Sequence, residues 1–218
     1  MENTQRQVPA PAPAPTPRRR KGAEAILEAA EVLFAERGYN AVPVSAIAAR
    51  AGVSKANVFH HFGTKDRLYL AVLRRACGAA TQVWHERMAG DGAFDARLRH
   101  AAGAHLRHLL EQEEVSRLLL REVVENGPRR GAELAEKVFD EHFDGLVRMI
   151  RDGQRNGELR EDADVSVVAA LLLGADVFFF LARSVLIHMK AATFASDPER
   201  YSDLIAEYLF SGLAPTHK

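Results

Sequence analysis

The sequence predicts an all-α fold with roughly nine helices, divided into a short N-terminal domain and a larger C-terminal body. Apolar residues recur at helical spacing along most of the 218 residues, and no stretch shows the sustained alternation of a half-buried strand. Hydrophobic residues make up 47% of the chain and charged residues 27%, which is typical of a packed core. The most apolar run, residues 165–182, carries Asp176 in its middle, so we expect no membrane span.

The N-terminal residues form a segment of different composition. Residues 1–17 are rich in alternating Pro and Ala, which cannot bury apolar surface, and residues 18–21 are all basic. We expect residues 1–21 to be a disordered arm whose basic end contacts a phosphate backbone, or serves only as a solubilising tail. The basic side chains of this end are Arg18, Arg19, Arg20 and Lys21.

The first helix is predicted from about Ala23, because apolar residues follow at i, i+3, i+4, i+7 and i+8 from Ile26. Gly38 is expected to end it. A second, short helix is expected over residues 44–51, with Ile47 facing inward.

Two further helices follow closely. Gly52 makes the turn, and Ser54 is a suitable N-cap for a helix over residues 55–62. Thr64 caps the next helix, which we expect over about residues 65–88. We therefore expect a first domain of residues 22–68.

The body, residues 69–218, shows the same periodicity between segments rich in Gly, Asp and Pro. The segment NGPRRG, residues 126–131, is expected to break the chain between two helices. The helical stretches predicted here are residues 98–109, 115–126, 134–149, 165–189 and 199–213.

The charge is divided unevenly, although the net charge of the chain is zero. Residues 1–75 hold 12 Lys and Arg against 6 Asp and Glu, whereas residues 76–218 hold 17 against 23. A basic N-terminal part on an acidic body indicates a polyanionic partner, with chance clustering as the alternative.

The second helix, the glycine turn and the third helix form a predicted helix-turn-helix, whose second helix enters the major groove of DNA. Lysine can donate to guanine and asparagine can bind adenine through two hydrogen bonds, so the exposed edge of the third helix is suited to reading bases. The predicted base-reading residues are Lys55, Ala56, Asn57 and His60. The predicted phosphate contacts around them are Ser45, Ser54, Phe59, His61, Thr64 and Lys65.

A metal site or an enzyme is a weaker interpretation. His60 and His61 are adjacent, so on a helix their side chains point about 100° apart and do not share an ion easily. The single cysteine, Cys77, excludes a disulfide framework and favours a reducing cytoplasm. With no nucleophile–base arrangement and no glycine-rich cofactor motif, we expect no catalytic residues, no metal and no cofactor.

The stretch from Ala23 to about Leu73 contains AxxLFAERGY and IAxxAGVSxxxVFxHFxxKDxL, and these motifs resemble the DNA-binding domain of the TetR/AcrR family of bacterial transcription repressors. The resemblance implies a homodimer that binds a palindromic operator and releases it when a small molecule enters the C-terminal domain. The chain departs from the family at two positions. Pro43 stands where Thr or Ser usually caps the second helix, with Ser45 two residues on, and Phe59 stands where Tyr commonly meets phosphate.

The last two helices are more apolar than a monomer core requires, which favours an intersubunit four-helix bundle over an ordinary core. Asp176 and Arg183 lie seven residues apart on one face and could fix the register of two subunits. The predicted interface residues are Leu173, Gly174, Asp176, Val177, Phe180, Arg183 and Leu209.

Inward-facing polar groups among aromatic side chains indicate a pocket in the body for an apolar or amphipathic small molecule. The candidate pocket residues are Trp84, His105, Glu122, Asn126, Phe139, His142, Phe143, Phe178 and Phe179. For each residue alone, ordinary core packing is the competing interpretation. A DNA-binding dimer without any effector is the alternative function.

Overall fold

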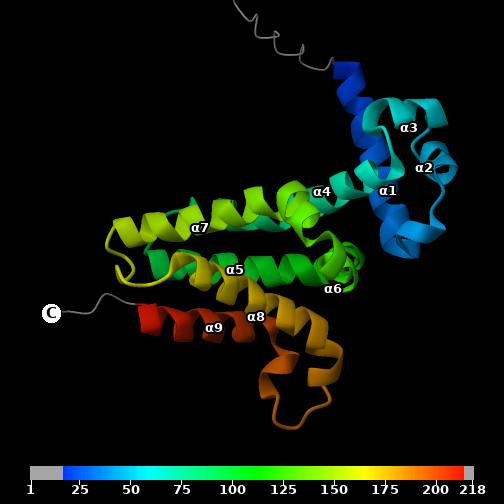
Figure 1. Ribbon diagram of the computed structural model, residues 1–218. Helices are drawn as coiled ribbons and strands as arrows, with labels where there is room; N and C mark the ends of the chain where they lie inside the picture. Colours follow the sequence, from blue (N-terminus) through cyan, green and yellow to red (C-terminus); the bar gives the residue numbers. More distant parts are fainter. Residues whose placement is uncertain (1–16, 214–218) are drawn as a thin grey trace, which may run out of the picture.

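The computed structural model describes the backbone of residues 17–213, and this part of the chain is helical with no strand (Figure 1). The prediction of an all-α fold with roughly nine helices is confirmed. The α-helices are α1 (Pro17–Ala41), α2 (Val44–Arg50), α3 (Lys55–Phe62), α4 (Lys65–Met88), α5 (Phe94–Glu111), α6 (Glu113–Leu134), α7 (Asp140–Arg155), α8 (Val165–Leu186) and α9 (Pro198–Leu213). A π-helical turn, η1 (Ala135–Phe139), joins α6 to α7, and a 3₁₀ turn, η2 (Thr193–Ser196), precedes α9.

Helices α1, α2 and α3 lie together at one end of the molecule, and α4 runs from them into the body (Figure 1). One apolar core lies among α1–α4 and includes Leu118 of α6 and Val138 of η1. A second core surrounds Trp84, Leu98 and Ile150, between α4, α5, α7 and α8. Because α4 contributes to both cores, it links the N-terminal helices to the body.

The first helix begins earlier than expected. The backbone of residues 17–21 belongs to α1, where we predicted a disordered arm, and Pro17 occupies the first turn, where proline is tolerated. Gly38 ends the regular part of the helix as predicted, with a φ of 76° that favours glycine. Residues 1–16 and the side chains of residues 17–21 lie outside the described part, and so do the phosphate contacts expected of Arg18, Arg19, Arg20 and Lys21.

The segment NGPRRG does not break the chain. Helix α6 continues through it with Pro128 inside and runs on into η1. Side-chain contacts hold this segment: Asn126 and Arg130 both contact the buried carboxylate of Glu122 earlier on the same helix, and Arg130 also pairs with Asp66 of α4. Packing and ion pairing here outweigh the low helix propensity of the segment.

Helix α8 alone, among the described residues, is long and apolar enough to cross a membrane by length and composition. Its inner side is packed in the protein, however, and Asp176 on that side is hydrogen-bonded to another buried side chain. The apolar residues on its other side remain exposed and need a different explanation.

Candidate nucleic-acid interface and ligand pocket

The turn between α2 and α3 has the geometry that the sequence predicts. Gly52 has a φ of 66°, and the backbone N–H of Val53 bonds back to the carbonyl of Ala48 at 3.0 Å. The hydroxyl of Ser54 then accepts a hydrogen bond of 3.1 Å from the backbone N–H of Asn57. Because this N-cap fixes the first turn of α3, the residues expected to read bases start from a rigid position.

Helix α3 presents most of the predicted base-reading residues to solvent. Lys55, Ala56 and His60 are exposed and Asn57 is half-buried, while Val58 points into the core at 2% exposure. The ammonium of Lys55 lies 5.8 Å from the centre of the Phe59 ring, which is itself exposed. A surface of this kind, with donors at the start of a helix and a small residue between them, fits the major groove.

Lys65 is not placed for a phosphate contact, and this prediction is corrected. Its ammonium donates to the backbone carbonyl of Tyr39 at 2.5 Å and lies 4.3 Å from the centre of the Tyr39 ring. Burial lowers the pKa of Lys65. The side chain thus ties the start of α4 to the end of α1, an interaction between distant segments that the sequence did not reveal.

Two exposed arginines near α3 were missed by the sequence reasoning. Arg67 follows the N-cap Thr64, whose hydroxyl accepts the Arg67 backbone N–H at 3.1 Å, and Arg50 is the last residue of α2. Both are basic residues beside a helix end in the helix-turn-helix, and that position could have identified them.

Ser45 and Ser54 are exposed as a phosphate contact requires, whereas His61 is half-buried and lies close to Gly22 of α1.

The body contains a cavity of about 290 Å³ between α4, α5, α7 and α8. Five of the nine residues predicted for the pocket line it: Trp84, His105, Phe139, His142 and Phe143. The lining residues that were not predicted for the pocket are Cys77, Ala80, Thr81, Leu109, Leu119, Leu146, Leu173 and Val177. Cys77, Thr81 and Trp84 belong to the same face of α4, so helical spacing from Trp84 could have found them.

Few polar groups face this cavity. Nδ1 of His105 lies 2.6 Å from Oδ2 of Asp176, and both side chains are buried. Burial raises the pKa of Asp176, and the hydrogen bond with His105 opposes that rise. Nε1 of Trp84 and Nε2 of His142 are buried without a hydrogen-bond partner among the described residues.

Four predicted pocket residues lie elsewhere. Phe178 is 54% exposed on the outside of α8, and Phe179 is fully buried against Tyr201, with ring centres 4.6 Å apart. They point in different directions because adjacent residues of a helix are separated by about 100°. Glu122 and Asn126 belong instead to a polar network near the N-terminal domain.

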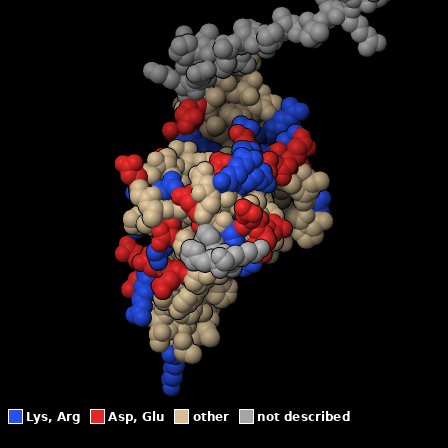
Figure 2. Space-filling view, turned by 90° about the vertical axis from the view of Figure 1, so that its left-hand side faces the viewer, with Lys and Arg blue, Asp and Glu red and all other residues tan. Residues whose placement is uncertain are grey.

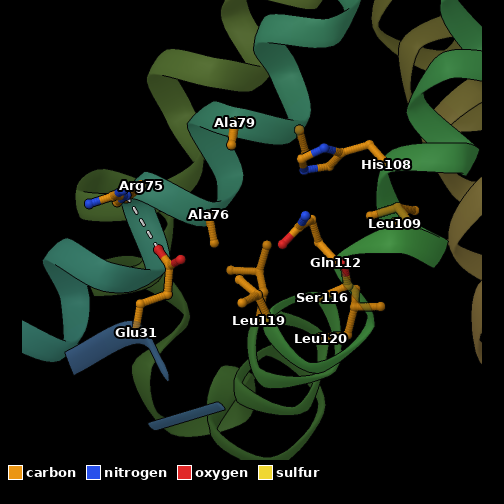
Figure 3. Close-up of a pocket in the computed structure, with 12 residues that line it drawn as sticks. Glu31, Arg75, Ala76, Ala79, His108, Leu109, Gln112, Ser116, Leu119 and Leu120 are labelled. Atoms are coloured by element: carbon orange, nitrogen blue, oxygen red, sulfur yellow. Dashed lines mark ion pairs between the residues drawn. The ribbon is translucent and has the colours of Figure 1, made fainter. Parts of the chain in front are cut away.

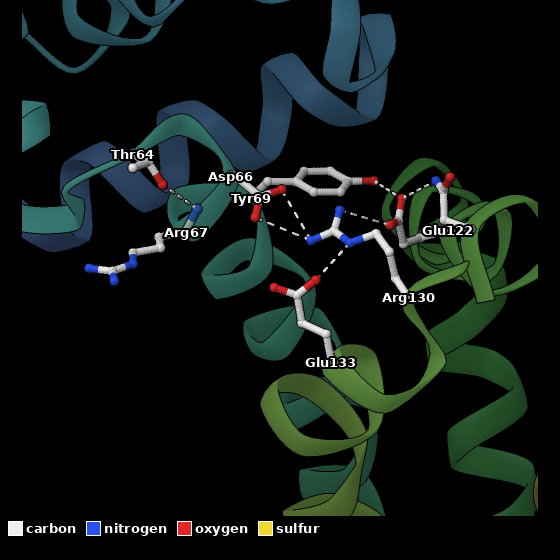
Figure 4. Close-up of polar contacts among 8 residues, drawn as sticks. Thr64, Asp66, Arg67, Tyr69, Glu122, Arg130 and Glu133 are labelled. Carbon is white, nitrogen blue, oxygen red and sulfur yellow. Dashed lines mark hydrogen bonds and ion pairs between the residues drawn. The ribbon is translucent and has the colours of Figure 1, made fainter. Parts of the chain in front are cut away.

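That network joins the first turns of α4 to α6 (Figure 4). Glu122 accepts hydrogen bonds from the Tyr69 hydroxyl at 3.1 Å and from Asn126 at 2.9 Å. Arg130 bridges Asp66 at 3.1 Å, Glu133 at 2.8 Å and Glu122 at 3.4 Å. We call these six residues the α4–α6 network. It connects the helix-turn-helix end of α4 to the body at one point, while the cavity contacts the same helix two to four turns further on.

A second, smaller cavity of about 170 Å³ lies between α4, α5 and α6 (Figure 3). His108 of α5 and Gln112, between α5 and α6, extend towards it, and the ion pair of Arg75 with Glu31, 3.4 Å long, lies at its side. Burial, followed by the neighbouring His105, lowers the pKa of His108. Leu109 and Leu119 line both cavities, so the two spaces are separated by single side chains.

The outer side of α8 carries an apolar stripe. Its members follow the helical repeat, so they share one face, and each of them is exposed: Val167, Leu171, Gly174, Phe178, Leu181 and Val185. The view from the far end of the body shows mixed charges above, and a largely uncharged lower part where the α8–α9 connection lies (Figure 2). Such a patch is unusual on a monomer.

Known proteins match both halves of the chain. A family model described as "Bacterial regulatory proteins, tetR family" matches residues 26–72, and one described as "Tetracyclin repressor-like, C-terminal domain" matches residues 91–177. The chain belongs to the TetR family. Members of this family are DNA-binding transcriptional regulators, and the two matches correspond to the helix-turn-helix end and to the body.

Individual relatives of this TetR-family chain resemble parts of it. An HTH-type transcriptional repressor of Mycobacterium tuberculosis is 45% identical over 82 residues, which is 38% of this chain and 44% of that protein. The activator FasR of Mycolicibacterium smegmatis is 52% identical over 50 residues, 23% of each chain. The matches therefore span less than half the length of these relatives.

A solved structure extends the likeness to the body. The fatty acid degradation regulator FadR from Bacillus halodurans superposes with a TM-score of 0.67 and 19% identity, covering 92% of this chain and 98% of that one. At this identity the match establishes the fold of the TetR-family body and not its ligand.

The interface predicted for α8 is only partly on the surface of the TetR-family protomer. Gly174 and Arg183 are exposed, but Asp176 and Phe180 are buried within the single chain, at 1% and 4% exposure. The expectation that Asp176 helps to fix the register of two subunits is wrong, because Asp176 faces His105 inside the protomer. Leu173 and Val177 line the cavity, and Leu209 packs against the second core.

Proposed function

We propose that the protein is a homodimeric transcriptional repressor that binds a palindromic operator through α3 and releases it when a small molecule occupies the body cavity. The observation that carries the proposal is the course of α4. This helix begins beside the reading helix, is fixed there by Lys65 and the α4–α6 network, and then forms one wall of the cavity with Cys77, Thr81 and Trp84.

The stripe on α8 supports dimerisation. Its six members lie along one side of a 22-residue helix, and Gly174 leaves room there for close approach of a second helix. A two-fold axis through such a helix pair would present two copies of α3 to the same face of DNA. Successive major grooves lie about 34–36 Å apart, which sets the separation that the two reading helices must match.

The cavity supports control by a ligand. Its volume of about 290 Å³ and its mainly apolar lining are those of a site for a small apolar or amphipathic molecule. A ligand that favours a shifted α4 needs only a few kcal/mol of differential affinity to empty an operator. The repressor among the relatives supports negative control. As a DNA-bound regulator the protein would act in the cytoplasm.

Operator binding and release test the proposal together. The purified protein is titrated onto DNA from upstream of its own gene, and compounds that raise its melting temperature are then added. The account expects a dimer on one protected palindrome and dissociation with at least one stabilising compound. If stabilising compounds never release DNA, the alternative function holds, which is a DNA-binding dimer without an effector. If the protein protects no site upstream of its own gene, it does not regulate that gene through this region.

A further inference from the structure

Two neighbouring residues that line the body cavity, Trp84 and His105, include a buried donor without a partner. Nε1 of Trp84 can only donate, it is fully buried, and it has no partner among the described residues. The imidazole of His105 lies against this indole, with ring centres 5.6 Å apart, and lines the same cavity. A buried donor left without an acceptor has lost its hydrogen bond to water and gained none in return, which is unfavourable. An occupant of the cavity that supplies an acceptor would replace this lost bond.

Asp176 determines what His105 can offer to such an occupant. Both side chains are buried and the cavity lining holds no Lys or Arg to balance a net negative charge, so the pair is taken to be electroneutral. The electroneutral pair is either imidazolium with carboxylate or imidazole with carboxylic acid, and one hydrogen lies between Nδ1 and Oδ2 in both forms. In both forms the second hydrogen is on Nε2. His105 is therefore a second N–H donor beside that of Trp84.

The rest of the lining limits the charge of the occupant. Among the described residues, the cavity wall contains no Lys, Arg, Asp or Glu. Thr81 is already engaged, because its hydroxyl donates to the carbonyl of Cys77 at 2.9 Å. A ligand carboxylate bound here would be a buried charge, and His142 is the sole remaining residue of the lining that could balance it. A neutral carbonyl oxygen needs only the N–H donors of Trp84 and His105.

We propose that the cavity selects a neutral molecule whose carbonyl oxygen accepts hydrogen bonds from Nε1–H of Trp84 and Nε2–H of His105, in preference to a carboxylate. This inference rests on the proposed function at one point only: it takes the molecule that occupies the cavity to be the effector. The volume of about 290 Å³ lies at the small end of the range for small-molecule sites and suits a compact molecule such as a bicyclic ketone or lactone.

The test uses three probes on one ring system: 1-tetralone, which has the carbonyl, tetralin, which lacks it, and tetralin-1-carboxylate. Calorimetry measures their affinities for the full chain. Trp84 is the only tryptophan and Cys77 the only cysteine, and both line the cavity. Changes in Trp84 fluorescence and protection of Cys77 from a thiol reagent therefore report whether a probe binds in this cavity.

We expect 1-tetralone to bind about tenfold more tightly than either tetralin or the carboxylate, which corresponds to about 1.4 kcal/mol. Trp84→Phe keeps an aromatic ring but removes the donor, so the preference should fall to about threefold or less. His105→Leu combined with Asp176→Val removes the pair without leaving a buried charge and should reduce the preference similarly. Glu86→Gln, at an exposed position of α4 outside the cavity lining, is the control and should keep the full preference.

Equal affinities for 1-tetralone and tetralin, tighter binding of the carboxylate, or an unchanged preference in both variants would overturn the inference. So would the absence of binding by all three probes, or binding without protection of Cys77. Operator DNA is added in a separate arm. Selective binding of 1-tetralone without release of DNA would support the carbonyl site and contradict its role as the effector site.

Discussion

The hydroxyl of Tyr69 on α4 donates a hydrogen bond of 3.1 Å to Oε2 of Glu122 on α6. Both residues are buried, and 53 positions separate them in the chain. Burial, followed by the charge of Glu122, raises the pKa of the Tyr69 hydroxyl, which therefore stays protonated and donating at neutral pH. This hydrogen bond holds the helix-turn-helix end of α4 against the body.

Removing that bond should loosen the junction. We expect Tyr69→Phe to lower the free energy of unfolding by about 1 kcal/mol, and Glu122→Gln by about 1–3 kcal/mol, since the latter also weakens the contact with Arg130. Denaturant titration followed by circular dichroism measures both. Glu125→Gln, an exposed position on the same helix, is the control and should change stability by less than about 0.5 kcal/mol. Equal effects of the two Glu variants would contradict a structural role for the network.

The basic residues around α3 should divide into two kinds. Arg67→Ala should weaken binding to any DNA and reduce the slope of log affinity against log salt by about one, because an exposed arginine lost from a phosphate contact releases one counterion fewer. Lys65→Ala should leave that slope unchanged and lower the melting temperature, because its ammonium is held by the Tyr39 carbonyl. Fluorescence anisotropy at several salt concentrations decides between the two roles, and a reduced slope for Lys65→Ala would restore it to the DNA contacts.

The single cysteine should react slowly. Burial raises the pKa of the Cys77 thiol from 9.0 to about 11, so at pH 8 the thiolate fraction is about 100-fold lower than in the unfolded chain. Alkylation of the native protein by iodoacetamide should be slower than that of the urea-unfolded protein by at least this factor.

The raised pKa of Cys77 also makes stability depend on pH. The thiol loses its proton in the unfolded chain first, so the free energy of unfolding falls as pH rises from about 9 to about 11. Cys77→Ala should remove that part of the decline, and an equal rate of alkylation in both states would contradict the burial of the thiol.

The stripe on α8 should mediate dimerisation. A Cβ at Gly174 meets nothing within 4 Å in the protomer, so Gly174→Leu does not strain the single chain and acts only on a neighbouring subunit. Analytical ultracentrifugation should give twice the chain mass for the parent protein and largely monomer for Gly174→Leu and for Phe178→Glu. Val124→Glu, at an exposed apolar position on α6, is the control and should remain dimeric. A dimer that survives both Gly174→Leu and Phe178→Glu would place the interface elsewhere.

The N-terminal domain could be predicted closely because its signals are local. Ser54 and Thr64 cap the helices they precede, and Gly38 and Gly52 adopt backbone conformations that favour glycine, so each boundary is encoded within a few residues. The role of Lys65 was missed, since a carbonyl 26 positions away decides it.

The body was harder to predict because its contacts join distant segments. Helical periodicity identified the inward face of α5, including His105, but not that Asp176 lies opposite it, 71 positions later. Asp176 was therefore assigned to the interface, and Phe178 was assigned to the pocket although its side chain is exposed. On a helix that is apolar nearly all round, composition does not distinguish the side facing the core from the side that stays exposed.

The measurement that tests the central claim most directly is selection of DNA from a random pool by the purified full chain, followed by binding of the enriched sequence to variants of α3. The account predicts an inverted repeat with half-sites one turn of DNA apart. Lys55→Ala and Asn57→Ala should each weaken binding to that repeat by about 1–3 kcal/mol while leaving binding to random DNA nearly unchanged. Enrichment of no sequence, or equal losses on the repeat and on random DNA, would contradict a sequence-reading role for α3.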